Sequence, residues 1–194
     1  MPGVVLRCPP MIWLSNSSIS RLRDRLRAQG TRSAPLPAAD ETTKTPVGVD
    51  LDALEMIDVA AQYEPFCEAM YLMMSADGKI TRDEREVLKG ALRSLSGGSA
   101  DAVQIEALVD RSAAQVAERG RDACLRDVIA RLREDPVRSE VAFVLAAAIA
   151  FADNAIADEE NEVLVAFAEG LGIDEERADE LLDSVEGDLG DRPV

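Results

Sequence analysis

Four carboxylates occur where they could bind a cation, because they belong to two copies of one short motif. Residues 76–88 match residues 152–164 at seven of thirteen positions. Two acids stand at equivalent places in each copy, and the four are Asp77, Glu84, Asp153 and Glu160. Carboxylate oxygens are the ligands that Mg²⁺ and Ca²⁺ prefer in proteins. These side chains are therefore candidate ligands for a hard divalent cation.

Each copy has the pattern of a turn between two helices. Gly78 and Asn154 occupy the same place, and these residue types best tolerate the left-handed conformation that ends helices. Ile80 and Ile156 recur as apolar anchors that would hold each turn on the core. We therefore expect a duplicated helix–turn–helix with an approximate two-fold axis. The four acids are expected to converge near that axis and to hold Mg²⁺ or Ca²⁺ there.

Helix capping is the competing interpretation of the two glutamates. Thr81 and Glu84 have the spacing of a capping box, in which each side chain accepts a hydrogen bond from the other residue's backbone N–H. In the second copy Ala157 takes the place of the threonine and cannot cap, yet Glu160 is retained. The first copy therefore favours a cap, and the second leaves cation binding open.

The two aspartates are also open to two interpretations. Asp77 and Asp153 follow apolar helices, and an acid at a helix C-terminus is disfavoured by roughly 0.3–1 kcal/mol. Each either closes its turn through an Asx-type hydrogen bond or binds a cation. An ordinary EF-hand loop is excluded, because the positions of its first two carboxylates hold no acid in either copy.

Charge and composition exclude several classes of function. The net charge is −16, and residues 1–32 carry six arginines and one aspartate, so the remaining chain carries −21. Nucleic acids and anionic membrane surfaces would repel such a body, whereas basic protein surfaces and metal cations would be attracted. Histidine is absent, which excludes mechanisms that depend on a histidine base. We therefore predict a protein that is not an enzyme and does not bind nucleic acid.

The cysteines indicate a reducing compartment. Cys8, Cys67 and Cys124 are odd in number and match no zinc or redox spacing. Cys67 and Cys124 fall within apolar helical patterns, so we expect both in the core. The longest apolar run, residues 141–152, is too short to cross a bilayer and is expected to form a buried central helix. These features predict a cytoplasmic protein without membrane insertion.

The apolar periodicity predicts an all-α bundle of about seven to eight helices. A helix over 52–62 is expected to end before Pro65, which would open the next one. Ser99 or Asp101 is expected to cap a later helix. Asp135 and Asp174 are expected to cap two more.

The chain divides into four segments by composition. Residues 1–29 form a basic arm, either poorly ordered or a short helix, and residues 30–50 form a proline-containing flexible linker. Residues 51–188 form the helical domain, and residues 189–194 form a frayed tail. The arm is either a loosely attached amphipathic segment or upstream sequence of little function.

The doubled turn after an apolar helix resembles the TerB-like (tellurite resistance) family. The resemblance is carried by residues 73–80 with Glu84, by residues 150–156 with Glu160, and by the closing segment 168–173. It extends over about 52–186. Asn154 stands where the family has a glycine in the second turn.

The resemblance implies a bacterial helical domain tied to tellurite resistance and chemical stress. A related domain forms the N-terminal region of the DjlA co-chaperones, and the family's acidic turns are suggested to bind divalent cations. We therefore expect a non-enzymatic, cation-responsive stress module. The alternative is an acidic helical domain that docks basic protein partners and binds no metal.

Overall fold

The computed structural model describes residues 16–30, 51–75, 80–150 and 158–186, and this part of the chain forms eight helices and no strand. The helices are α1 (Asn16–Gly30), α2 (Leu51–Met74), α3 (Arg82–Ser96), α4 (Ala102–Arg119), α5 (Arg121–Leu132), α6 (Pro136–Ala150), α7 (Asp158–Leu171) and α8 (Glu175–Glu186). The predicted all-α bundle is confirmed. Most of the expected linker and the C-terminal tail lie outside the described residues.

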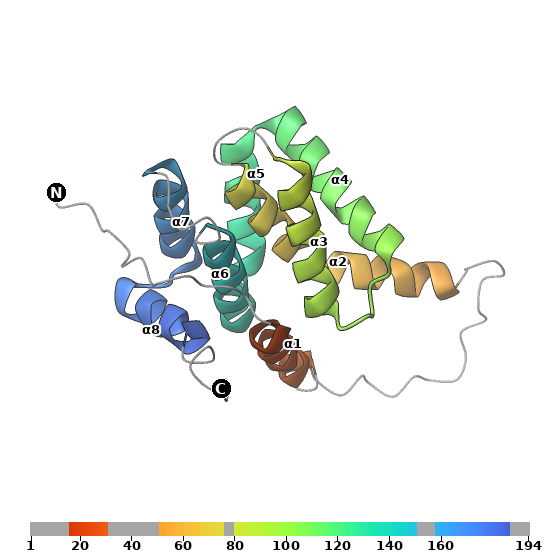
Figure 1. Cartoon of the computed structure of the whole chain (residues 1–194), viewed down its shortest axis with the longest axis horizontal. Coiled ribbons are helices and arrows are strands. Elements are labelled where there is room, and N and C mark those ends of the chain that lie inside the picture. The colour runs from red at the N-terminus through yellow and green to blue at the C-terminus, as the bar shows by residue number, and fades with distance from the viewer. Residues whose placement is uncertain (1–15, 31–50, 76–79, 151–157, 187–194) are drawn as a thin grey trace, which may run out of the picture.

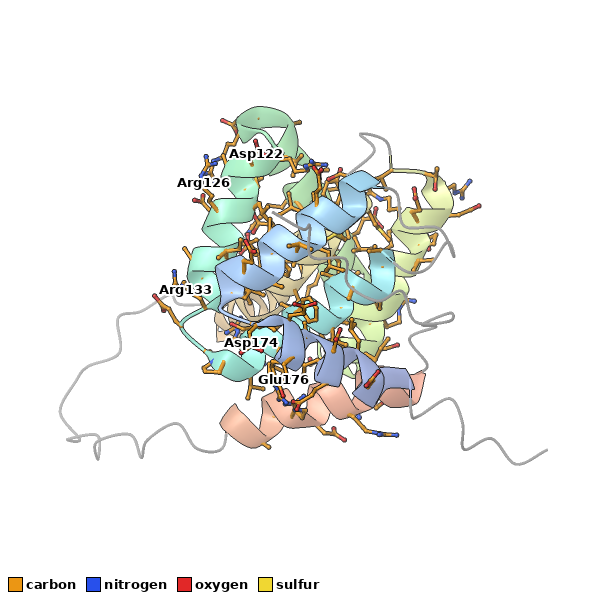
Figure 2. The ribbon with its side chains drawn as sticks, turned by 90° about the vertical axis from the view of Figure 1, so that its left-hand side faces the viewer. Asp122, Arg126, Arg133, Asp174 and Glu176 are labelled. Atoms are coloured by element: carbon orange, nitrogen blue, oxygen red, sulfur yellow. The ribbon has the colours of Figure 1, made fainter. Side chains whose placement is uncertain are left out.

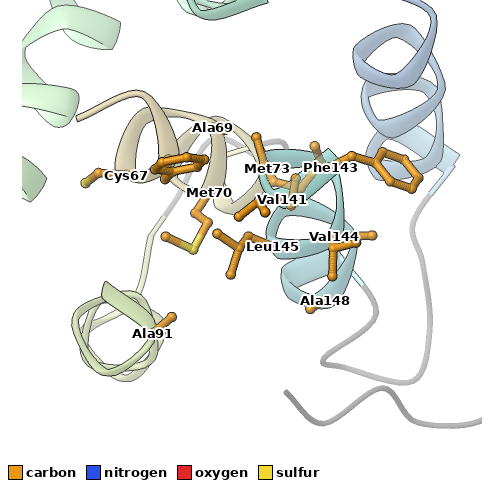
Figure 3. Close-up of a cluster of buried hydrophobic side chains, with 14 of the residues drawn as sticks. Cys67, Ala69, Met70, Met73, Ala91, Val141, Phe143, Val144, Leu145 and Ala148 are labelled. Carbon is orange, nitrogen blue, oxygen red and sulfur yellow. The ribbon is translucent and has the colours of Figure 1, made fainter. Parts of the chain in front are cut away.

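Two helices, α2 and α6, form the centre of the bundle (Figure 1). Every residue from Val141 to Ala148 is buried, so this part of α6 is apolar on all sides, as expected of a central helix. Figure 3 shows Met70 and Met73 of α2 meeting Leu145 and its neighbours on α6. The alanines of α6 allow this close approach because they present only a methyl group to the facing helix.

The outer helices cover the two central ones in a repeated arrangement. Helix α2 packs against α3, α4 and α5, and α6 packs against α5, α7 and α8. Each central helix is therefore followed in the sequence by a helix that packs against it, α3 after α2 and α7 after α6. This order agrees with the duplication predicted from the two acidic turns.

The predicted break before Pro65 is wrong, because α2 runs through this proline without interruption. Proline has no N–H to donate to the carbonyl of Ala61, which costs the helix one hydrogen bond. The next carbonyl, that of Gln62, accepts a hydrogen bond at 3.0 Å from Nη2 of Arg138 on α6. The Arg138 guanidinium also lies 5.4 Å from the centre of the Phe66 ring. Packing against α6 thus stabilises α2 at Pro65, where the local sequence favours the end of one helix and the beginning of another.

Four predicted helix caps are present. Asp101, rather than Ser99, caps α4, where its Oδ1 accepts the Gln104 N–H at 2.8 Å. Asp135 accepts the N–H groups of the first turn of α6. Asp174 Oδ1 accepts the Arg177 N–H at 2.8 Å. Thr81 caps α3. These caps satisfy backbone donors that would otherwise lack partners.

Cys67 and Cys124 are fully buried, as predicted. Burial raises the pKa of the Cys67 thiol to about 12, against the weaker opposing effect of a hydrogen bond from the Ser112 hydroxyl. Burial also raises the pKa of Cys124. Both residues are therefore core side chains held as neutral thiols.

The described part of the basic arm lies in α1, which packs against α3 and α6 at one end of the bundle (Figure 1). Ile19 and Leu22 are buried and Leu26 is packed against the core. Residues 16–30 of the predicted arm are thus helical and packed against the domain, and the rest of the arm lies outside the described residues.

Candidate functional site

Glu84 is the one predicted ligand whose side chain the structure places. It lies in the first turn of α3, where its Oε2 accepts the Thr81 N–H at 2.6 Å. In return, Thr81 Oγ1 accepts the Glu84 N–H at 3.3 Å. The capping box read from the sequence is therefore formed. A carboxylate has two oxygens and can cap through one while the other coordinates a cation.

The side chains of the other three predicted ligands lie outside the described part of the structure. Asp77 and Asp153 lie outside the described residues, and Glu160 lies in α7 with its side chain outside the described set. The convergence of the four acids thus stays a prediction. Within the described part of the chain, no group of three or more acidic or cysteine side chains is arranged to hold a metal ion.

The described residues on both sides of segment 76–79 are attached to the core. Before it, the Ser75 N–H donates to the Tyr71 carbonyl at 3.0 Å and the Ser75 hydroxyl donates to the Leu72 carbonyl at 3.1 Å. After it, Ile80 packs against the core cluster, as predicted for an anchor. Its counterpart, Ile156, lies outside the described residues. Ser75 and Ile80, the described residues on either side of segment 76–79, are therefore held by the helical core.

Basic residues next to Glu84 are already engaged by other acids. Arg85 Nη2 donates to Glu106 Oε1 at 2.7 Å and also to Asp110, and Lys89 lies 2.5 Å from Glu106 Oε2. Hydrogen bonds from Lys89 and Arg85 lower the pKa of Glu106. This network joins α3 to α4. Glu84 itself accepts its hydrogen bond from a backbone N–H, that of Thr81.

A second acidic centre, which the sequence interpretation missed, lies at Glu140 on α6. Its Oε1 accepts hydrogen bonds from Nε and Nη2 of Arg177 on α8, at 2.9 and 2.7 Å. Its Oε2 accepts from Nη2 of Arg25 on α1, at 2.6 Å. Only 16% of the Glu140 side chain is exposed. One carboxylate thus binds arginines from two helices at opposite ends of the sequence.

A buried acid on α2, Glu68, was also missed. Its side chain is 1% exposed and forms an ion pair with Arg131 of α5. Burial raises the pKa of Glu68, and Arg131 counteracts part of this effect. The signal in the sequence was an acid within the apolar stretch from Phe66 to Met74. The arrangement joins α2 to α5.

The α7–α8 corner contains a small hollow of about 80 Å³, with Val165, Ile173 and Ala178 among its lining residues. Figure 2 shows Asp174 and Glu176 at the adjoining start of α8. Pockets for drug-sized ligands measure about 300–1,000 Å³, so this hollow is too small for one. The Asp174 carboxylate that lines it is used as a helix cap.

Comparison with known proteins gives one match. A family model described as "Tellurite resistance protein TerB" matches residues 66–183. No curated protein and no solved structure matches the chain. Among the helices described, none combines the length and the apolar character needed to cross a bilayer.

Proposed function

The chain belongs to the tellurite resistance protein TerB family, and from this premise we propose that it is a non-enzymatic stress-response module whose acidic turns bind a divalent cation. The observation that carries the proposal is the extent of the family match. Residues 66–183 include both copies of the acidic motif, the C-terminal part of α2 that precedes the first copy, and all of α6, which precedes the second.

The chemistry of the four acids supports Mg²⁺ or Ca²⁺ as the cation. Asp77, Glu84, Asp153 and Glu160 offer only oxygen ligands, which hard cations prefer. Four converging carboxylates repel one another unless a positive charge lies between them. The described network directs Arg85 and Lys89 toward α4, so neither is committed to neutralising Glu84. A bound cation would supply the missing charge.

The proposed module acts by binding and not by turnover. The sequence has no histidine, and the buried thiols of Cys67 and Cys124 are held neutral. We propose that it works in the reducing cytoplasm of a bacterium, where these thiols persist. Its acidic surface suits partners with basic surfaces.

Thermal unfolding with added cations tests the proposal. A cation present at about 100 times its dissociation constant, bound only by the folded chain, stabilises it by ~2.7 kcal/mol. For a chain of this size the melting temperature should rise by roughly 5–10 °C. K⁺ at matched ionic strength controls for screening of the acidic surface.

A pair of double variants locates the effect. Asp77→Asn with Asp153→Asn should remove the divalent-specific rise, and Glu118→Gln with Glu134→Gln removes two exposed charges elsewhere and should leave it intact. If Mg²⁺ and Ca²⁺ stabilise the unmutated chain no more than K⁺ does, the acids are turn and cap residues and no cation site exists.

The formed capping box favours a second candidate function. Because Glu84 accepts the Thr81 N–H, its retention in the motif is explained without a metal. In this alternative the domain is an acidic protein–protein interaction module. This alternative predicts that Mg²⁺ and Ca²⁺ stabilise the chain no more than K⁺ does. It also predicts that basic partners bind equally well in EDTA.

A further inference from the structure

The basic helix α1 is bound to the acidic domain in the way that a separate peptide ligand would be bound. It precedes the residues that match the family, and residues 31–50 separate it from α2 in the sequence. Its apolar contribution is small: Ile19 and Leu22 are buried and Leu26 packs against the core. These three positions form the single stripe typical of an amphipathic helix seated in a groove.

Charge fixes α1 at two points. Arg25 Nη2 lies 2.6 Å from Glu140 Oε2 on α6. Arg23 and Arg27 lie over the C-terminal end of α3, so close to Gly97 that a Cβ built there would be 2.9 Å from Arg23 Nη1 and 3.2 Å from Arg27 Nη2. The end of a helix carries partial negative charge, which favours these guanidinium groups.

Two features of the α3 and α6 surface beneath α1 accommodate its arginines. Gly97 ends α3 with a φ of +59°, so the position favours glycine, and the missing side chain leaves room for the arginines. Glu140 is held from the other side by Arg177, whose Nη2 lies 2.7 Å from Oε1, so the carboxylate is fixed in position for Arg25. Figure 2 shows α1 along the base of the bundle, below α6 and α8.

From these contacts we infer that the groove between α3 and α6 is a docking site for a basic amphipathic helix of a partner protein, and that α1 occupies it as a competing intramolecular ligand. The partner helix carries two apolar residues three apart and an arginine three residues after the second, as Ile19, Leu22 and Arg25 do. The inference rests on the proposal that the domain binds basic protein partners, and it identifies the surface between α3 and α6 as their binding site.

The tether determines how strongly α1 competes. Residues 31–50 join α1 covalently to α2, and a ligand linked in this way can reach an effective concentration of about a millimolar. A free helix of equal intrinsic affinity is therefore excluded at micromolar concentration while the connection is intact. Cutting the connection should open the groove without changing any contact in it.

The test uses the full chain with a specific protease site placed within residues 31–50, in EDTA. A fluorescent peptide of residues 16–30 serves as the probe, and its anisotropy reports binding. We expect the uncut chain to exclude the peptide. After cutting, the N-terminal fragment should exchange with the peptide, while circular dichroism shows the remaining helices intact.

A charge exchange locates the peptide in the groove. Glu140→Lys should weaken peptide binding at least about tenfold, and a peptide with Arg25→Glu should recover it on that variant. Glu118→Lys, at the end of α4, makes the same charge change away from α1 and should leave binding unchanged. Recovery by the complementary peptide also shows that the Glu140→Lys chain is folded.

Three results would overturn the inference. The first is a cut chain that keeps its fragment without exchange or unfolds when the fragment leaves, which would make α1 an integral helix. The second is an equal loss of binding in the Glu140→Lys and Glu118→Lys chains. The third is a full chain that is dimeric until it is cut, which would assign the groove to α1 of a second copy. Because EDTA removes divalent cations, none of these results depends on cation binding, which is tested separately by thermal unfolding.

Discussion

The backbone of Gly170 on α7 lies directly against the side chain of Ile129 on α5. A Cβ atom at position 170 would be 2.6 Å from Ile129 Cδ1 and 3.0 Å from its Cγ2. Real carbon atoms do not approach so closely, and the branched isoleucine has few alternative rotamers. Gly170 therefore sets the distance between α7 and α5, which pack against each other.

Alanine substitution should have opposite effects at two helical glycines. Gly90 in α3 has no atom within 4 Å of a built Cβ, so Gly90→Ala should stabilise the chain by ~0.8–1 kcal/mol through helix propensity. Gly170→Ala gains the same propensity but overpacks against Ile129, at a cost of ~1–3 kcal/mol, and should be destabilising by about 1 kcal/mol. Denaturant unfolding measures both. Ile129→Val removes the nearest methyl group and should recover part of the Gly170→Ala loss; equal effects at the two glycines would contradict the packing.

The buried pair of Glu68 and Arg131 predicts an asymmetric response to substitution. Burial raises the pKa of Glu68 above its value in the unfolded chain, so the folded state binds this proton more tightly. Its contribution to stability is full below the unfolded pKa and is lost as the pH rises through the folded pKa. Glu68→Gln should remove this loss, and at about pH 7.5 it should be at least as stable as the unmutated chain.

Removal of Arg131, unlike Glu68→Gln, should lower the stability of the folded chain at neutral pH. Arg131→Met leaves the buried Glu68 carboxylate without its ion-pair partner, which raises the pKa of Glu68 further. Because Arg131 is 41% exposed, we expect a moderate loss of about 1–3 kcal/mol near neutral pH, decreasing toward pH 4. Urea unfolding at several pH values measures it. A Glu68→Gln chain that is the less stable of the two variants at neutral pH would contradict this assignment.

The core thiols should be unreactive until the chain unfolds. Burial holds the pKa of Cys67 at about 12 and raises that of Cys124, so neither forms the reactive thiolate near pH 8. In a Cys8→Ser chain, a disulfide reagent should titrate no thiol under native conditions and both thiols in guanidinium. Rapid native reaction would show that the packing around α2 or α5 opens easily.

Capping and cation binding at Glu84 can be separated by two substitutions. Glu84→Gln keeps an oxygen that accepts the Thr81 N–H, so stability in EDTA should change little, while the divalent-specific rise in melting temperature should shrink. Thr81→Ala removes one half of the cap and should cost ~0.5–2 kcal/mol in EDTA while the rise persists. If Glu84→Gln leaves the response to Mg²⁺ and Ca²⁺ intact, Glu84 is not a ligand.

The features that could be predicted from the sequence are those decided by neighbouring residues. Asp101, Asp135 and Asp174 cap helices because each acts on backbone groups two or three residues away. The buried α6 could be predicted because an apolar run of that length has no polar face to present to solvent.

Features that depend on distant residues could not be predicted. Glu140 accepts from Arg25, 115 residues earlier, and nothing in the local pattern of either residue identifies the other. The continuation of α2 through Pro65 depends on Arg138 and Phe66, which meet only when α2 and α6 pack. Of the candidate site, the Glu84 cap could be predicted because it is local, whereas convergence of the four acids depends on the packing of the two halves.

The complete burial of residues 141–148 on α6 has a consequence for how this domain tolerates sequence change. Ala142, Ala146 and Ala147 have no exposed surface, so a larger side chain at any of them must displace a neighbouring helix. Val103 on α4, by contrast, is 75% exposed, so a larger side chain there can extend into solvent. A saturating mutagenesis scan should therefore find a nearly invariant alanine row along α6 and permissive outer faces on α4 and α5. Substitutions that change the charge of these outer faces should leave the spacing between the helices around α6 unaltered.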